Sequence, residues 1–108
     1  MEEIEAMQVM SALSQATRLE VFRRLVDTLP DGMASGELAT AVGSSPNTMS
    51  SHLAVLTRAG IVRPDKVGRT VIYRAVTEPV EALSAFLSVA CETRDHDVIT
   101  ELPAKKTK

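Results

Sequence analysis

The 108-residue sequence contains one cysteine, no tryptophan, one tyrosine and two phenylalanines. A single cysteine cannot form an internal disulfide, which is consistent with a reducing cytoplasm. So few aromatic rings argue against a protein that stacks single-stranded nucleic acid on aromatic side chains. No segment approaches the roughly 18 consecutive apolar residues of a membrane span, and the Met-Glu-Glu start lacks the basic beginning of a signal peptide. These absences predict a small cytoplasmic protein that does not enter a membrane.

The sequence also lacks the motifs of several common enzyme classes. It has no Walker phosphate-binding loop, no G-x-G-x-x-G dinucleotide fingerprint and no nucleophile elbow. We therefore expect a protein that is not an enzyme and that needs no cofactor.

Charged residues are absent from residues 38–57, a segment that overlaps one capped helix. Ser45 is a good N-cap, because its hydroxyl oxygen can accept a hydrogen bond from an amide of the first turn. Pro46 suits the first helical position, and Gly60 suits the left-handed conformation that ends a helix. A rotation of about 100° per residue places three apolar side chains on one narrow stripe that must face a core: Met49, Leu53 and Leu56.

The opposite face of this helix carries mostly short side chains, Asn47, Thr48, Ser51, Ala54 and Arg58. An exposed helix usually carries oppositely charged pairs spaced four residues apart, and this face has none. Short hydroxyl and amide side chains permit close approach to another surface and offer hydrogen bonds to base edges and phosphates. The face is therefore either a DNA-reading surface or an ordinary polar surface.

The segment before this helix completes a helix-turn-helix pattern. Residues 36–43 predict a short helix capped by Ser35, with Leu38 and Val42 spaced four apart on its buried edge. Only a turn at residues 43–45 separates the two helices, and a tight turn containing glycine is typical of a helix-turn-helix.

The segment after the helix predicts a β-hairpin. Two β-rich runs at residues 61–67 and 70–76 surround Gly68-Arg69, as expected for strands joined at a glycine turn. Pro64 cannot donate to a strand ladder, so it should lie at a sheet edge or a bulge. The predicted fold class is α+β, mostly α with a small β-hairpin: a winged helix-turn-helix of about five helices plus a two-stranded wing.

Apolar periodicity predicts a further helix at residues 16–29, and Met33-Ala34 could form a very short strand. The pattern is lost after residue 92. We therefore predict one winged-helix domain at residues 1–92 and a flexible C-terminal tail at residues 93–108.

The first and last predicted helices, at residues 3–13 and 79–92, carry more apolar surface than one small winged helix can bury. Pairing these helices across a two-fold axis would cover that surface and place two reading helices on one duplex. The sequence therefore predicts a homodimer that associates through these two segments.

Charge is unevenly distributed along a chain whose overall net charge is −2. Residues 1–40 are acidic, and so are residues 77–108. Residues 41–76 hold one acidic residue, Asp65, and five basic residues: Arg58, Arg63, Lys66, Arg69 and Arg74. This local positive charge, with Lys66 and Arg69 at the predicted hairpin tip, favours phosphate binding over a merely solvated wing.

Five segments then occur in a characteristic order: Leu13-Ser-Gln-Ala-Thr-Arg-Leu-Glu-Val-Phe22, Gly36-Glu-Leu-Ala39, Thr48-Met-Ser-Ser-His-Leu-Ala-Val-Leu56, Ala59-Gly-Ile-Val62 and Gly68-Arg-Thr-Val-Ile-Tyr73. Together they resemble the ArsR/SmtB family of winged-helix repressors over roughly residues 4–90. The resemblance implies a homodimer that binds a palindromic double-stranded DNA operator. It also implies release from DNA when an inducer, usually a metal or metalloid ion, binds.

By motif position, the resemblance implies a recognition helix whose DNA-facing residues are Asn47, Thr48, Ser50, Ser51 and His52. It implies a wing at residues 66–70, with Lys66, Arg69 and Thr70 as DNA-binding candidates. Ser45 at the helix start and Arg58 on its outer face complete the candidate set. His52 lies at the boundary between the two helix faces and could either brace the turn or touch phosphate.

The sequence departs from the family where an inducer would bind. One sensor type of the family has a Cys-x-Cys run before the recognition helix, but residues 33–42 contain no cysteine. Another has Asp, two His and Glu on the last helix, where this chain offers only His96. A third has adjacent cysteines at the end of that helix, and Ala90-Cys91 keeps at most one. Because thiophilic ions prefer several thiolates, one cysteine per subunit is a poor site.

Three interpretations of Cys91 stay open. It is a buried or incidental thiol, since free cysteine often behaves as a small hydrophobe. Alternatively, it is a redox-active or cross-subunit thiol. In the third, it is a metal ligand together with Glu92, Asp95 or His96, although His96 is more simply a solvated tail residue.

We conclude from the sequence that the chain is a sequence-specific DNA-binding transcriptional repressor that acts as a homodimer, with a metal(loid), redox or other signal as its trigger. Two alternatives remain. One is a winged-helix dimer that acts only through protein partners, and the other is a metal- or redox-binding protein without specific DNA binding.

Overall fold

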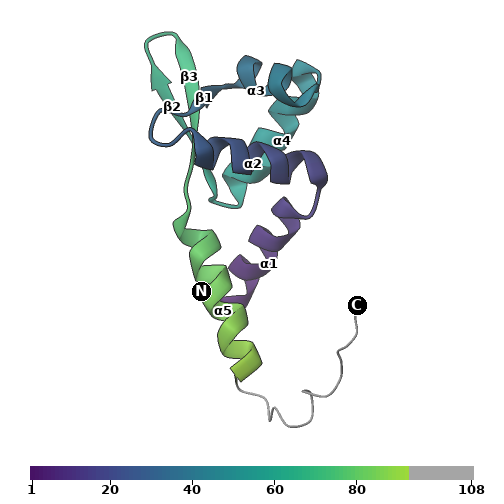
Figure 1. Cartoon of the computed structure of the whole chain (residues 1–108), viewed down its shortest axis with the longest axis vertical. Coiled ribbons are helices and arrows are strands. Elements are labelled where there is room, and N and C mark those ends of the chain that lie inside the picture. The colour runs from purple at the N-terminus through teal and green to yellow at the C-terminus, as the bar shows by residue number, and fades with distance from the viewer. Residues whose placement is uncertain (93–108) are drawn as a thin grey trace.

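The computed structural model describes residues 1–92 and confirms a winged helix-turn-helix (Figure 1). The predicted tail at residues 93–108, with Asp95 and His96, lies outside the described residues. The elements, in chain order, are α1 (Glu3–Leu13), α2 (Ala16–Asp27), β1 (Met33–Ala34), α3 (Ser35–Val42), α4 (Pro46–Arg58), β2 (Val62–Val67), β3 (Thr70–Ala75) and α5 (Glu78–Glu92).

The molecule has two ends with different contents (Figure 1). The helix-turn-helix, α3 and α4, lies at one end together with the β2–β3 hairpin. At the other end α1 and α5 contact each other, and α2 lies between the two ends. No helix among residues 1–92 is long and apolar enough to cross a membrane.

The wing is the antiparallel β2–β3 hairpin, as predicted, but the sheet has a third strand. Its order is β1-β3-β2, and the two-residue β1 pairs Met33 with Tyr73 and Ala34 with Ile72. Pro64 lies on β2 at the edge of the sheet, which confirms its predicted place, because an edge strand can lack a ladder donor.

Helix α4 begins and ends as its sequence predicts. Ser45 is the N-cap and its Oγ accepts a hydrogen bond from the Thr48 amide at 3.2 Å. Pro46 occupies the first turn, and Gly60 beyond the helix end has φ +81°. The predicted apolar stripe is fully buried, so the opposite face is directed away from the core.

Two predicted helix ends are wrong. Helix α3 is capped at Ala34, and Ser35 is its first helical residue. The Glu37 carboxylate accepts a hydrogen bond from the Ala34 amide at 2.9 Å, and a glutamate at this position can satisfy the cap amide without a serine. Helix α2 ends at Asp27, two residues early, because the Leu29 amide donates to the carbonyl of Val26, three residues back, and Pro30 has no amide hydrogen to continue the helix.

The hydrophobic core joins all the helices, but α1 and α5 contribute only part of their apolar surface. On α1 the small residues Ala6, Val9 and Ala12 are buried. On α5 only Leu83 is buried. Large apolar side chains of both helices stay exposed in the single chain: Ile4 at 69%, Met7 at 57%, Met10 at 39%, Leu87 at 43% and Val89 at 56%.

Candidate nucleic-acid interface

The first turns of α4 present small polar side chains to solvent. Asn47, Thr48, Ser50 and Ser51 are all exposed. Ser45 Oγ accepts from the Thr48 amide, which is the cap bond, and donates to Thr48 Oγ1 at 2.9 Å, so the Thr48 hydroxyl hydrogen forms no bond within residues 1–92. Within residues 1–92 no hydrogen bond occupies the side chains of Asn47 and Ser51, which leaves both available to a ligand.

His52 lies one turn further along α4 and is half-buried. Burial lowers its pKa below the ordinary histidine value, and the positive charge of Arg18 lowers it further. The neutral ring is therefore favoured near pH 7. In that form His52 can donate or accept a hydrogen bond, but it does not offer a positive charge to phosphate.

The tip of the wing carries two cations. Arg69 lies in the hairpin turn, Lys66 lies one residue before the end of β2 and Thr70 begins β3; all three are exposed. Neither cation forms an ion pair with any residue in the described part of the chain. The tip can therefore place two positive charges and a hydroxyl group against a phosphate backbone.

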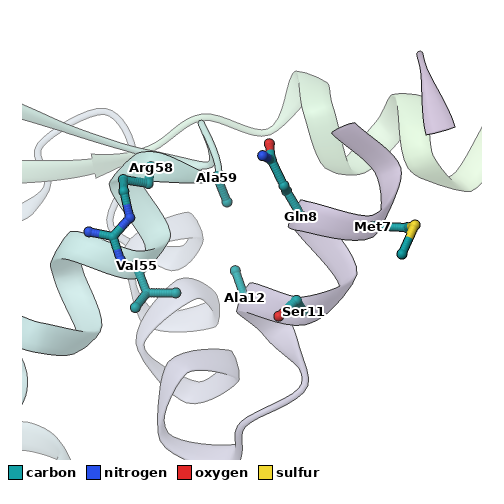
Figure 2. Close-up of a pocket in the computed structure, with 7 residues that line it drawn as sticks. All are labelled: Met7, Gln8, Ser11, Ala12, Val55, Arg58 and Ala59. Atoms are coloured by element: carbon teal, nitrogen blue, oxygen red, sulfur yellow. The ribbon is translucent and has the colours of Figure 1, made fainter. Parts of the chain in front are cut away.

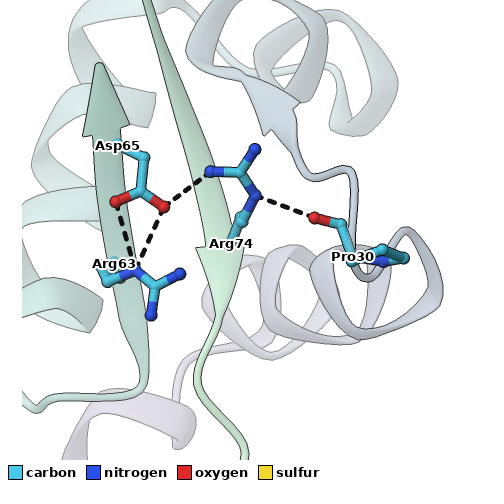
Figure 3. Close-up of polar contacts among 4 residues, drawn as sticks. All are labelled: Pro30, Arg63, Asp65 and Arg74. Carbon is cyan, nitrogen blue, oxygen red and sulfur yellow. Dashed lines mark hydrogen bonds and ion pairs between the residues drawn. The ribbon is translucent and has the colours of Figure 1, made fainter. Parts of the chain in front are cut away.

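At the base of the wing, unlike at its tip, the arginines form ion pairs with an acidic residue (Figure 3). Arg74 Nη1 lies 2.6 Å from Asp65 Oδ2, and Arg63 Nε lies 3.1 Å from the same oxygen. Arg74 Nε also donates to the carbonyl of Pro30 at 2.8 Å. The hydrogen bond from Arg74, with that from Arg63 and the charges of both, holds the pKa of Asp65 below its ordinary value.

These contacts change the interpretation of the positive segment at residues 41–76. The sequence predicts five cations above a DNA surface, but Arg74 ties β3 to β2 and to the loop after α2. A sequence pattern cannot show this, because Pro30 and Arg74 are 44 positions apart. Lys66 and Arg69 are thus the wing cations that remain available.

Arg58 lies at the far end of α4 from the other candidates. Ten residues separate it from Thr48, which corresponds to about 15 Å along a helix axis. It borders a groove of about 540 Å³ between α4 and α1 (Figure 2), lined by Met7, Gln8, Ser11, Ala12, Val55, Arg58 and Ala59. The structure therefore groups Arg58 with the α1 side of the molecule.

The candidate metal ligands are only partly described. Cys91 lies in the last turn of α5 and is exposed, so it is not a buried thiol in the single chain. Glu92 follows it, whereas Asp95 and His96 fall outside the described residues. Among residues 1–92 no group of three or more His, Cys, Asp or Glu side chains could hold a metal ion.

Known proteins with similar sequences are helix-turn-helix transcriptional regulators. A helix-turn-helix domain family matches residues 13–65. The chain is 38% identical over 76 residues to the HTH-type transcriptional regulator KmtR of Mycobacterium tuberculosis, covering 70% of this chain and 56% of that relative, little more than half its length. It is 33% identical over 88 residues to the putative arsenical resistance operon repressor ArsR2 of Halobacterium salinarum, covering 82% of this chain and 70% of ArsR2.

Solved structures agree with the sequences. An ArsR-like transcriptional regulator from Rhodococcus has a TM-score of 0.76 at 28% identity, covering 95% of this chain and 96% of that one. The homodimeric winged helix-turn-helix DNA-binding domain of a possible ArsR-family regulator from Mycobacterium bovis has a TM-score of 0.65 at 26% identity, covering 86% and 84% of the two chains.

Proposed function

The chain belongs to the ArsR/SmtB family of winged helix-turn-helix transcriptional regulators, and on that premise we propose that it represses transcription by binding a palindromic DNA operator as a homodimer. Members of this family are regulators of transcription, not enzymes. The observation that carries the proposal is that the exposed first turns of α4 carry no charge and lie at the same end of the molecule as the wing (Figure 1), whose tip cations Lys66 and Arg69 form no ion pair among residues 1–92. We propose that the protein acts in the cytoplasm.

Dimerisation is supported by the apolar surface of α1 and α5. These helices contact each other and leave Ile4, Met7, Leu87 and Val89 exposed at one end of the molecule. Large exposed apolar side chains gathered on neighbouring helices are typical of an interaction site. The homodimeric M. bovis domain shares this fold. We assign the interface to residues 3–13 and 79–92, and the whole DNA-binding and dimerisation domain to residues 1–92.

DNA recognition divides between base and phosphate contacts. We assign base-edge contacts in the major groove to Asn47 and Ser51, whose exposed side chains form no hydrogen bond within residues 1–92. Ser50 and His52 border them, while Ser45 and Thr48 hold the helix start whose amides face phosphate. Lys66, Arg69 and Thr70 contact the backbone beside the groove, and Arg58 plays at most a peripheral part.

The proposal is tested by a gel shift with the DNA upstream of the protein's own gene, at low salt and with unrelated DNA as competitor. We expect a complex that survives the competitor and contains two protein chains. A folded dimer that binds the upstream DNA no more tightly than unrelated DNA would contradict the proposal and favour a regulator that acts through protein partners.

We also propose that an inducing signal releases the protein from its operator. Titrating the complex with As(III), Zn(II) or peroxide while following DNA release by fluorescence anisotropy identifies the class of signal. As(III) is expected to act weakly, because one thiolate per subunit is a poor site for a soft ion. Complete release of the DNA at a stoichiometric concentration of As(III) would contradict that expectation.

Replacing Asn47 with alanine is expected to relax specificity at one base position by about 1–3 kcal/mol, because an asparagine amide can pair with adenine through two hydrogen bonds. The measurement is binding to a library of operators that differ by single base pairs. Asp27→Ala, which removes an exposed polar side chain from α2 outside the assigned interface, should leave the specificity profile intact. Uniform weakening across the library would contradict a base contact by Asn47.

Replacing Arg69 with alanine is expected to weaken binding to all DNA sequences by a similar factor. The slope of log K against log salt should fall by about 0.9 for each phosphate that the protein no longer neutralises, thus about twice that per dimer. Arg23→Ala removes an exposed cation of α2 and serves as the control. An unchanged slope in Arg69→Ala would show that the wing tip does not bind phosphate.

A further inference from the structure

A short connection joins helices α1 and α2, and the side chain of Arg18 forms hydrogen bonds across it. Only Ser14 and Gln15 lie between the two helices. The Gln15 side chain accepts a hydrogen bond from the Arg18 amide at 2.8 Å. The Arg18 guanidinium turns back, and its Nε donates to the carbonyl of Ala12 at 2.8 Å while Nη2 lies 3.5 Å from the carbonyl of Ser11.

These contacts give hydrogen-bond donors to carbonyl groups at the C-terminal end of α1, where the helix has no cation of its own. The last carbonyls of a helix lack partners within the helix and carry partial negative charge. No basic residue lies in the last turn of α1. Arg18 supplies that charge from the next helix, and its planar fork reaches two successive carbonyls. The direction in which α1 leaves α2 therefore depends on this side chain.

Packing between α1 and α4 does not fix that direction alone. The groove of about 540 Å³ separates Met7, Gln8 and Ser11 of α1 from Val55 and Arg58 of α4 (Figure 2). The buried side chains of α1 are mostly small, with Ala6 and Ala12 on either side of Val9. Small side chains beside a groove interdigitate less than large ones, so a contact at the end of α1 adds to what sets the angle between the two helices.

Arg18 also lies close enough to α4 for its charge to act there. It lowers the pKa of His52 on the recognition helix, after the larger effect of burial. Its side chain is half-buried, at a junction where α1, α2 and α4 all contact one another. One residue of α2 thus contacts the end of α1 and acts electrostatically on α4.

We infer that Arg18 is a positioning residue for DNA recognition: by fixing the angle between α1 and α4, it sets the distance between the two recognition helices of the dimer and so the preferred spacing of operator half-sites. This inference rests on the proposed dimeric, DNA-binding function. Helix-turn-helix dimers bind half-sites about one helical turn apart, so a small change of angle at the interface alters the fit to a given spacing.

The test compares Arg18→Gln with Arg23→Gln. Arg23 is exposed on the same helix and makes no hydrogen bond or ion pair in the part of the chain that the structure describes, so both variants lose one positive charge from α2. Each protein is titrated with an operator that wild type selects from a random library, and with derivatives whose spacer is one base pair shorter or longer. Sedimentation checks that each variant is dimeric.

We expect wild type and Arg23→Gln to prefer the selected spacing by at least about tenfold, which corresponds to the 1.4 kcal/mol of one decade. Arg18→Gln should bind the three spacings within about threefold of one another. The ratio between spacings is unaffected by a loss of folded protein, because every DNA is titrated with the same sample. A wild-type ratio in Arg18→Gln would overturn the inference.

Should Arg18→Gln not fold, Arg18→Lys decides the question. A lysine keeps the charge at the end of α1 but lacks the fork that reaches both carbonyls. A folded Arg18→Lys with a reduced spacing preference supports the inference, and one with the full wild-type preference overturns it. Wild-type protein that shows no spacing preference would instead contradict the proposed dimeric function, independently of Arg18.

Discussion

Replacing Ile4 with glutamate is expected to lower the affinity for a two-half-site operator by about 10²–10⁴-fold, because a monomer loses the intramolecular second binding event of a dimer. The Ile4 side chain is 69% exposed in the single chain and lies on the α1 surface that we assign to the interface. Two-fold symmetry places the new carboxylate in that interface twice, and burying an unpaired charge is costly. Sedimentation should show a monomer at concentrations where wild type is dimeric.

The matched control for this variant is Leu19→Glu. Leu19 is also a large exposed apolar residue, at 41%, but it lies on α2 outside the assigned interface. The same change of chemistry there should leave both dimerisation and operator affinity close to wild type. An Ile4→Glu protein that stays dimeric and binds the operator with wild-type affinity would remove α1 from the interface.

Helix α4 could be predicted almost completely because its signals are local. Ser45, Pro46 and Gly60 mark its two ends, and the spacing of its apolar residues gives the buried face within four turns. Each signal acts on residues that are close in the chain, so no knowledge of the tertiary structure is needed. The exposed face of the candidate DNA site follows directly from the buried one.

Contacts between distant residues could not be predicted in the same way. Arginine is a residue type expected at a phosphate contact, yet the guanidinium of Arg74 donates hydrogen bonds to Asp65 and to the carbonyl of Pro30. Arg18 belongs to a segment that signals the family, but the sequence gives no sign that its guanidinium turns back to the end of α1. From the sequence alone, such charged residues are taken to be available for DNA, because their partners become visible only in the folded structure.

The loop after α2 shows the same limit at a glycine. Gly32 follows a Pro-Asp pair and predicts only a helix break, but its backbone lies directly against β3. A β-carbon built at Gly32 would lie 2.5 Å from the carbonyl oxygen of Tyr73 and 2.7 Å from Cγ2 of Ile72. Together with the bond from Arg74 to Pro30, this close approach holds the base of the wing against the rest of the domain.

Replacing Gly32 with alanine is therefore expected to lower the free energy of unfolding by about 2–5 kcal/mol, the sum of about 1–2 for a left-handed backbone and about 1–3 for overpacking. Gly32 has φ +77°, and its nearest contact is a backbone atom that cannot move away as a flexible side chain can. For a domain of this size the midpoint of thermal unfolding should fall by more than about 8 °C. Denaturant unfolding at one fixed protein concentration measures the change, since dimer stability depends on concentration.

Gly43→Ala separates the two contributions to this destabilisation. Gly43 has nearly the same backbone angle, φ +73°, but a β-carbon there meets no atom within 4 Å. Its replacement should cost only the backbone part, about 1–2 kcal/mol. The excess destabilisation in Gly32→Ala then measures how tightly the loop is held against β3, and that excess should be accompanied by weaker DNA binding through the wing. Equal destabilisation in the two variants would show that the loop moves aside at little cost and does not position the wing.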